Sequence, residues 1–569
     1  MALLCWSSRF VWRWHAQVLM ATSLAAILVL SLVSSSNADN VGTFDLVGLI
    51  ADLPTKQFYI NGTWVEPAPP SSETFKRFIN VVDPSTAETA AKVAIAGPED
   101  VDAAVKAAKE AWLEWSYHTP LNERKRYVQK LARIYASKIE EMAQLISTEM
   151  GSPIEAARES HAWGGLSNIE SSLELIDEFE FEKPLGDDEL TTILYESIGV
   201  VGMITPWNWP LNQITLKVVP ALLVGCTCVL KPSEESPLSA LLFAEMVHQA
   251  GFPPGVFNLV NGDGPFTGDS LTKHPDLDMI SFTGSTRAGR QVAVNAALGP
   301  IKTTLELGGK GANIFFADVG DEWMEEVVVN GVESVFYNSG QTCNAPTRML
   351  VQQPFYNMAV ELATNIAKTN SPVDSAHEDG DEHIGPVVSR NQFERIQEYI
   401  QIGIDEGARL VAGGLGRPEH LANHPSKKNG YYVRPTVFAD CKPSMTIMQE
   451  EIFGPVLCIV PFTTEDEALQ LANDTPYGLT NYVHSRNFNR RRRMGRLLRS
   501  GMVEMNDAAG DHGSPFGGVK GSGYGREGGI FGFEEFCIIK ALTGFIPGED
   551  DLFFDQELET SAGTEEAEL

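Results

Sequence analysis

Residues 202–231, GMITPWNWPLNQITLKVVPALLVGCTCVLK, indicate the fold class. A short apolar run opens this stretch and another closes it, and the segment between them is long enough for a helix and two loops. Similar runs recur downstream, and their successive starts lie 27, 28, 23 and 24 residues apart, at Gly202, Val229, Phe257, Ile280 and Thr304. Strands that alternate with helices at this spacing predict an α/β fold with a parallel sheet.

Helical patterns lie between and before these runs. The clearest predicted helix has Ser236 as its N-cap and Pro237 at its first helical position, and it ends near Gly251. Upstream, residues 98–115 and 121–150 carry apolar side chains at helical spacing, so we expect them to pack on the sheet.

Composition narrows the class of protein. The chain has 569 residues, which is room for several domains, and its 43% hydrophobic content excludes collagen-like and globally disordered proteins. Its formal charge is −32, which repels phosphate backbones, so we expect no nucleic-acid partner. Seven cysteines are too few for a disulfide scaffold. Cys226 and Cys228 have no companions at metal-ligand spacing, so we interpret both as core residues and expect no metal site.

The two ends of the chain differ from its middle. Arg9 and Arg13 precede an uncharged apolar run from Val18 to Val33, which predicts a signal peptide or anchor at residues 1–38. We therefore expect the endoplasmic reticulum or secretory pathway, with a mitochondrial or plastid transit peptide as the alternative, and membrane contact only through this segment. Residues 547–569 form an acidic tail without a basic residue.

The residues directly after each predicted strand are the first candidates for a site, because ligands of open α/β sheets bind beyond the carboxyl ends of the strands. These positions carry polar, aromatic or glycine residues in every case. In chain order they are Trp207 and Asn208, Lys231 and Glu234, Gly264 and Gly268, Gly284 and Ser285, and Glu306.

Three of these groups suggest a dinucleotide. Lys231 and Glu234 could hold the hydroxyls of an adenosine ribose, and Glu234 would repel a 2′-phosphate, which favours NAD over NADP; a surface salt bridge is the alternative. Gly284 and Ser285 could face a pyrophosphate from a helix N-terminus, or Ser285 could be an ordinary cap. Gly264 and Gly268 depart from the usual G-x-G-x-x-G spacing, so surface-loop glycines remain the alternative.

One cysteine, Cys343, ends an unusual segment. Residues 336–343 are polar and contain glycine. This segment is one of several motifs that occur in a fixed order: PWN-x-P at 206–210, KPSE at 231–234, FTGST at 282–286, ELGGK at 306–310, F-x-N-x-G-Q-x-C at 336–343, EEIFGPV at 450–456 and SPFGG-x-K at 514–520. In this order the motifs resemble the aldehyde dehydrogenase superfamily over about residues 55 to 546.

The resemblance implies an architecture. A variant Rossmann domain for the dinucleotide would comprise residues 54–180 and 199–306, and a second, catalytic α/β domain would comprise residues 307–520. Residues 181–198 and 534–546 would form a β-arm for oligomerisation. Exposed strand edges favour pairing with another subunit, so we expect a homodimer or homotetramer.

The resemblance also implies a chemistry with NAD as cofactor and a small-molecule aldehyde as substrate. Cys343 would be the nucleophile, Asn208 with the Cys343 backbone N–H would bind the oxyanion, and Glu306 would be the general base. The thiolate would form a thiohemiacetal, NAD would take the hydride, and water would hydrolyse the thioester to the acid.

Further residues receive roles by the same resemblance. Glu451 would hold the nicotinamide ribose with Phe453 packed nearby, and Trp207 would line the cofactor path. Lys217 would poise the site electrostatically or be a solvated helix lysine. The alternatives are a non-catalytic protein of the same fold, a CoA-acylating dehydrogenase, which needs no base for water, and a thiol protease, for which the cysteine context is lacking. The sequence does not name the aldehyde; we expect medium-chain or aromatic aldehydes.

Overall fold

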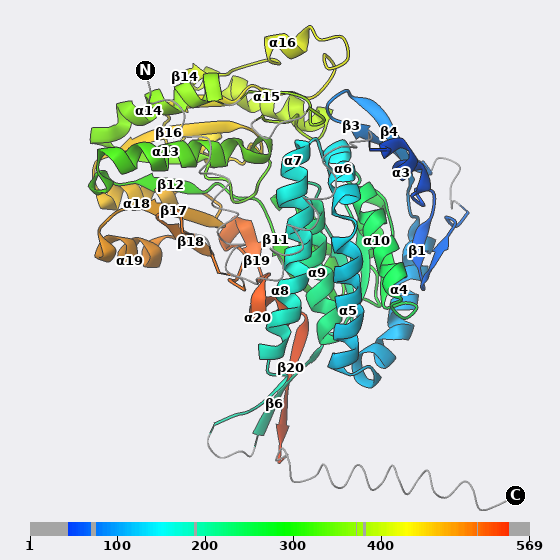
Figure 1. Cartoon of the computed structure of the whole chain (residues 1–569). Helices are drawn as coiled ribbons and strands as arrows, with labels where there is room; N and C mark the ends of the chain where they lie inside the picture. Colours follow the sequence, from blue (N-terminus) through cyan, green and yellow to red (C-terminus); the bar gives the residue numbers. More distant parts are fainter. Residues whose placement is uncertain are drawn as a thin grey trace, which may run out of the picture.

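The computed structural model describes residues 44–69, 76–186, 191–370, 372–378, 383–508, 510–511 and 513–544. The predicted signal or anchor at 1–38 and the acidic tail at 547–569 lie outside these residues. Figure 1 shows two sheet-containing bodies side by side, with a narrow arm below one of them. Within the described ranges, no helix combines the length and the apolar character needed to cross a membrane.

The first sheet has eight strands. In spatial order they are β19 (Gly523–Tyr524), β11 (Lys302–Glu306), β10 (Met279–Thr283), β7 (Val200–Ile204), β8 (Thr227–Lys231), β9 (Phe257–Leu259), β1 (Phe58–Ile60) and β2 (Thr63–Val65). The five predicted strands are its central neighbours and pair in parallel, which confirms the prediction. Only the outer strands β19, β1 and β2 pair antiparallel.

The strand order reverses between β7 and β10. From β7 the chain moves outward to β8 and β9, then returns to β10 and β11 on the other side of β7. The loops that follow β7 and β10 therefore leave in opposite directions, and such a point is where open α/β sheets bind ligands. Trp207 and Asn208 follow one of these strands, and Gly284 and Ser285 follow the other.

Helices cover both faces of this sheet. One face packs against α5 (Leu121–Ala136), α6 (Ile139–Met150), α8 (Trp163–Leu175), α9 (Pro210–Val224) and α10 (Leu238–Ala250), and the other against α4 (Pro98–Leu113), α11 (Asp269–Thr272) and α12 (Thr286–Ala296). Cys226 and Cys228 are buried in the first of these layers, as predicted. The predicted helix at 121–150 is two helices, because Ser137 and Lys138 interrupt it.

The start of α10 differs from the prediction. The helix begins at Leu238, and the buried Ser236 hydroxyl has no hydrogen-bond partner among the described residues. The carboxylate of Glu149, at the end of α6, instead accepts hydrogen bonds from the backbone N–H groups of Leu238 (2.5 Å) and Ser239 (3.1 Å). A carboxylate also interacts favourably with the positive end of the helix dipole, so it replaces the predicted serine cap.

The second sheet has seven strands, all parallel except the first. They are β14 (Arg409–Ala412), β15 (Thr436–Ala439), β16 (Val456–Phe462), β13 (Arg348–Gln352), β12 (Ala312–Phe315), β17 (Thr480–His484) and β18 (Met502–Met505). One face packs against α13 (Asp321–Phe336) and α14 (Tyr356–Asn365), and the other against α15 (Arg390–Asp405), α17 (Thr446–Gln449), α18 (Glu465–Asn473) and α19 (Phe488–Leu497).

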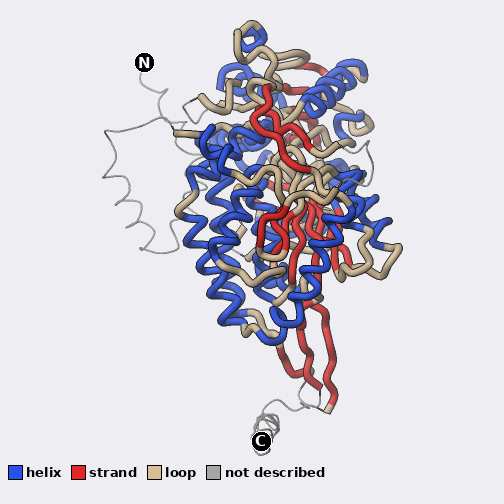
Figure 2. The backbone as a smooth tube through the Cα atoms, turned by 90° about the vertical axis from the view of Figure 1, so that its right-hand side faces the viewer, coloured by secondary structure: helices blue, strands red, loops and turns tan. Residues whose placement is uncertain are grey.

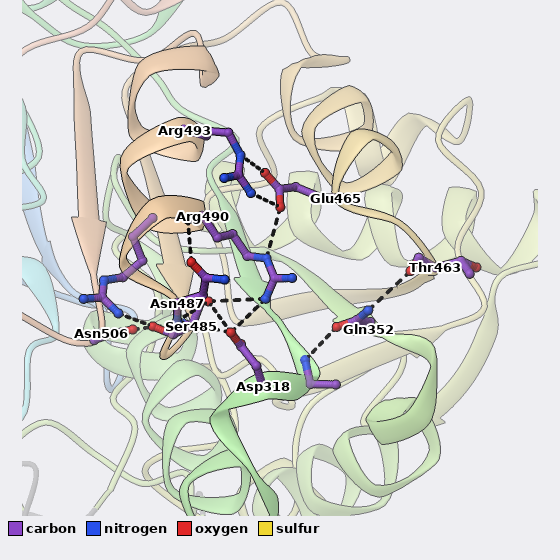
Figure 3. A network of polar contacts seen from close by, with 11 residues as sticks. Asp318, Gln352, Thr463, Glu465, Ser485, Asn487, Arg490, Arg493 and Asn506 are labelled. Atoms are coloured by element: carbon purple, nitrogen blue, oxygen red, sulfur yellow. Dashed lines mark hydrogen bonds and ion pairs between the residues drawn. The ribbon is translucent and has the colours of Figure 1, made fainter.

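The arm is a three-stranded antiparallel sheet. Its order is β20 (Cys537–Thr543), β6 (Thr191–Ser197) and β5 (Glu182–Pro184), so it falls in the segments from which an arm was expected. Figure 2 shows it projecting from the body as a narrow extension. The remaining elements include α3 (Leu46–Asp52), the hairpin β3 (Phe78–Asp83) and β4 (Glu88–Ala94), α7 (Ile154–Ala156), α16 (Glu419–Ala422) and α20 (Gly529–Glu535).

Candidate active site

Cys343 follows α13 through an irregular turn. Asn338, Ser339 and Gly340 have φ angles of 51°, 57° and 71°, so the chain passes through three successive left-handed residues. A side chain at Gly340 would place its Cβ 2.2 Å from the Gly454 backbone, so only glycine fits this close approach. The turn leaves the Cys343 side chain half-buried.

The same turn brings Cys343 against the end of β11. A Cβ on Gly309 would lie 2.3 Å from the Cys343 carbonyl oxygen, so the two backbones are in contact. Gly309 lies three residues after Glu306, the last residue of β11. The predicted nucleophile and the predicted base are therefore brought together by backbone packing between the two sheets.

Asn208 joins them from the loop after β7. Its side chain is buried, and its Nδ2 donates to the Gln341 carbonyl at 3.0 Å. Asn338 Nδ2 donates in turn to the Asn208 carbonyl at 2.9 Å. The loop that carries Asn208 is thus hydrogen-bonded to the turn that carries Cys343.

Glu306 has a buried carboxyl to which no described residue donates a hydrogen bond. Its side chain is 3% exposed, and neither carboxylate oxygen has a hydrogen-bond partner among the described residues. Burial raises its pKa well above the usual value, and the negative charge of Glu527 raises the pKa further, whereas Lys217 and Arg526 lower it. The site therefore favours the protonated form of Glu306 more than water does.

Burial also raises the pKa of the Cys343 thiol, to about 12, and the carboxylates of Glu451 and Glu306 add to this shift. At neutral pH the side chain of this predicted nucleophile is therefore a thiol. Because the charge of Glu306 acts on the thiol, the two groups lie within electrostatic range of each other.

Sequence reasoning missed Glu527. It lies in a glycine-rich loop and forms an ion pair with Lys217 of α9, whose side chain is fully buried. The interpretation of Lys217 as a solvated helix lysine is wrong, because the ion pair replaces the solvent. The only local sign of Glu527 was a charged residue among the glycines of residues 523–529.

The predicted ribose-binding pair lies at the end of β8. Lys231 is buried, and its Nζ donates to the carbonyls of Pro232 and Gly262, both at 2.8 Å. The Glu234 carboxylate lies 3.7 Å from the same nitrogen, and its side chain is 39% exposed. The salt bridge and the ribose site are therefore compatible, because one carboxylate oxygen of Glu234 remains for a hydroxyl group.

The glycine and serine candidates have different surroundings. Gly264 begins a π-helical turn and has open space where a side chain would be, whereas Gly268, at its end, lies against the Lys231 side chain. Ser285 is the N-cap of α12, and its hydroxyl accepts a hydrogen bond from Ala288 N at 3.3 Å. The hydroxyl is thus used as an ordinary cap, directly after Gly284.

Glu451 and Phe453 lie in the segment between α17 and β16 of the second sheet and meet the loops of the first. Glu451 Oε1 accepts a hydrogen bond from Gly309 N at 2.9 Å, and burial raises its pKa to about 7. Phe453 packs edge-on against Trp207, with ring centroids 5.3 Å apart. Acidic oxygens for ribose hydroxyls, a buried ammonium and an aromatic pair are groups of the kind that hold a dinucleotide, so the chemistry of these residues fits one.

Comparisons with known proteins agree with this arrangement. Residues 70–542 match the model of the aldehyde dehydrogenase family. The chain is 45% identical to a 3-succinoylsemialdehyde-pyridine dehydrogenase of a Pseudomonas species, over 86% of this chain and 98% of the relative. It is 42% identical to a putative aldehyde dehydrogenase of Staphylococcus aureus, over 86% and 99%.

Solved structures give the same result. The crystal structure of an aldehyde dehydrogenase from Bartonella henselae superposes with a TM-score of 0.82 at 51% identity, over 86% of this chain and 99% of that one. A mutant of aldehyde dehydrogenase C from Pseudomonas syringae, in complex with NAD+ and octanal, gives 0.81 at 44% identity, over 87% and 98%.

The chain belongs to the aldehyde dehydrogenase family. The predicted family and α/β fold are confirmed, and so is the predicted class of enzyme, an oxidoreductase that oxidises aldehydes with NAD.

Proposed function

We propose that Cys343, Glu306 and Asn208 oxidise an aldehyde to its carboxylic acid with NAD. The observation that carries this assignment is that three residues from separate segments of the chain lie together. Asn208 follows β7, Glu306 ends β11 and Cys343 follows α13, yet hydrogen bonds and backbone contacts bring all three to one place. A scaffold protein has no physical need for an unpartnered carboxyl beside a thiol.

The first step is attack by sulfur. The Cys343 thiol releases its proton to solvent, which makes the sulfur a nucleophile. The thiolate adds to the carbonyl carbon and gives a thiohemiacetal. Asn208 Nδ2 has a second N–H beside the one given to Gln341, and this N–H and the Cys343 backbone N–H stabilise the alkoxide.

NAD, when bound, accepts the hydride that leaves the thiohemiacetal carbon. The chain's own residues hold it in place. We assign cofactor binding to Trp207, Lys231, Glu234, Gly264, Gly268, Gly284, Ser285, Glu451 and Phe453.

The last step is hydrolysis of the thioester on Cys343. Glu306 takes a proton from water, the resulting hydroxide attacks the thioester carbon, and the acid leaves as the Cys343 sulfur regains its proton. A carboxyl with free oxygens is available for water in a way that a hydrogen-bonded one is not. The unpartnered state of Glu306 therefore suits this step.

The test is the effect of Cys343→Ala on the reduction of NAD, followed by absorbance with a panel of medium-chain and aromatic aldehydes. One relative is named for a pyridine semialdehyde, and the solved structure of another holds octanal. Both support this choice of panel. We expect activity in the wild type and none in the variant, with NAD binding retained in both. A wild type that binds NAD but oxidises no aldehyde would favour the non-catalytic alternative.

We also propose a homodimer or homotetramer formed through the arm. β20 is an edge strand of the arm sheet, and its Ile538 and Ile539 side chains are 42% and 67% exposed. β18 is an edge strand of the second sheet, so both offer unpaired backbone groups. Light scattering of the wild type and of Ile539→Lys would test this; a variant of unchanged mass would contradict it.

For localisation we propose the endoplasmic reticulum or secretory pathway, directed by residues 1–38, with membrane contact only through that segment. The support is the apolar run after two arginines. Microscopy of the full chain and of a chain without these residues, each fused to a fluorescent protein, would test it. Mitochondrial or plastid fluorescence of the full chain would favour the transit-peptide alternative.

A further inference from the structure

Asn338 holds Asn208 through its amide nitrogen. Asn338 Nδ2 donates to two carbonyl oxygens, that of Asn208 at 2.9 Å and that of Gln341 at 3.3 Å. The Gln341 carbonyl also accepts Asn208 Nδ2 at 3.0 Å. Asn208 is therefore fixed at both its backbone and its side chain by the turn that precedes Cys343.

The orientation of the Asn338 amide is determined by these acceptors. With the amide reversed, its oxygen would face two carbonyl oxygens and both hydrogen bonds would be lost. Asn338 is 6% exposed, so water has little access to replace them. The nitrogen must therefore face Asn208.

Gln341 makes the other end of this arrangement rigid. Its side chain is fully buried, its Nε2 donates to the Asn338 carbonyl at 3.1 Å, and its Oε1 accepts from Val388 N at 2.9 Å. Its own backbone N–H also donates to the Asn338 carbonyl at 3.0 Å. The carbonyl that receives Asn208 Nδ2 thus belongs to a residue that cannot turn away.

We propose that Asn338 is a positioning residue for the oxyanion-binding amide. By fixing the Asn208 backbone and sharing the Gln341 carbonyl with the Asn208 side chain, it directs the second N–H of Asn208 toward the carbonyl oxygen of the substrate. This inference rests on the proposed function, in which Asn208 stabilises the alkoxide.

A simpler explanation of Asn338 is its backbone. Its φ of 51° is a left-handed conformation, and asparagine adopts it more readily than most residues. Under this explanation glycine would serve equally well, because it has no Cβ to strain the turn. Under the positioning explanation glycine fails, because it lacks the amide.

Asn338→Gly therefore separates the two explanations. We expect kcat/KM to fall about 10- to 100-fold, mainly through kcat, because a small displacement of a catalytic group has effects of this size. NAD affinity, measured by fluorescence titration, should stay unchanged. Ser339→Gly is the matched control, since Ser339 has a φ of 57° in the same turn but donates to the Gly385 carbonyl at 2.8 Å. It should retain activity.

A double-variant cycle completes the test. Asn208→Ala alone should lower kcat/KM by about 10²- to 10³-fold, as loss of one oxyanion donor does. Adding Asn338→Gly to it should have little further effect, because the group that Asn338 positions is already gone.

The outcomes distinguish two failures. Full activity of Asn338→Gly, or multiplicative losses in the double variant, would overturn the positioning role while leaving Asn208 its function. Full activity of Asn208→Ala would instead overturn the oxyanion assignment under the proposed function.

Discussion

Two buried glutamates in different regions of the molecule differ in their hydrogen bonding. Glu149 lies at the end of α6 and Glu306 at the end of β11, and they are 0% and 3% exposed. Glu149 accepts two backbone hydrogen bonds at the start of α10. Neither oxygen of Glu306 accepts any hydrogen bond from the described residues.

The two sites differ in whether hydrogen bonds offset the free-energy cost of burying the carboxyl. Burial raises the pKa of both, to about 7 for Glu149 and well above the usual range for Glu306. Two N–H groups offset the cost at Glu149, whereas nothing that the structure describes offsets it at Glu306 by hydrogen bonding. Glu149, which caps a helix, has hydrogen-bond partners, whereas Glu306, the proposed base, has none among the described residues.

The largest expected effect is that of Glu306→Gln on turnover. An amide cannot take a proton from water, so steady-state kcat should fall by about 10²- to 10⁴-fold. Stopped-flow absorbance should show a burst of NADH followed by slow turnover. The matched variant Glu149→Gln should retain kcat. Loss of the burst in Glu306→Gln would show that the carboxyl is required before hydride transfer.

A smaller effect is expected in the stability of Glu149→Gln relative to wild type. Glu149 titrates near pH 4.5 when unfolded and near 7 when folded, so the folded state binds more protons between these values. The stabilisation by Glu149 is fully present below about pH 4.5 and declines by about 3 kcal/mol as the pH rises through 7. Urea midpoints at pH 5 and pH 8 measure this. A stability difference that grows with pH would contradict it.

The smallest effect is a shift in a pH profile. Glu527 raises the pKa of Glu306, and Glu527→Gln also leaves Lys217 unopposed, which lowers the pKa further. The acid limb of the kcat profile should therefore move to lower pH, by about one unit. Glu535→Gln, which removes a weaker contribution, should move it less. A shift to higher pH would contradict the assignment of Glu527.

The sequence predicted the parts of the molecule whose signal is local. Buried parallel strands appear as short apolar runs, and β7 to β11 were found in this way. Asn208 was a candidate because it follows such a strand, Glu306 because it ends one, and Cys343 because of its motif. The structure brings the three together, and their roles remain predictions.

Other features depend on residues far apart in the chain. Glu149 caps a helix 89 residues away, and Lys217 pairs with a glutamate 310 residues away, so no local pattern indicated either contact. The interruption at Ser137 and Lys138 was missed because apolar residues continue at helical spacing across it. Asn338 belongs to a sequence motif, but the motif does not predict its hydrogen bond to the Asn208 carbonyl. That contact arises from packing between the two sheets.

The protonated state of Cys343 has a consequence outside the catalytic cycle. Peroxides convert thiolates to sulfenic acids, whereas thiols react slowly. With burial raising its pKa to about 12, the resting sulfur is a poor target for such damage. The other cysteines that the structure describes are buried. The enzyme should therefore withstand oxidative stress while idle and be most vulnerable during turnover, when its sulfur loses the proton.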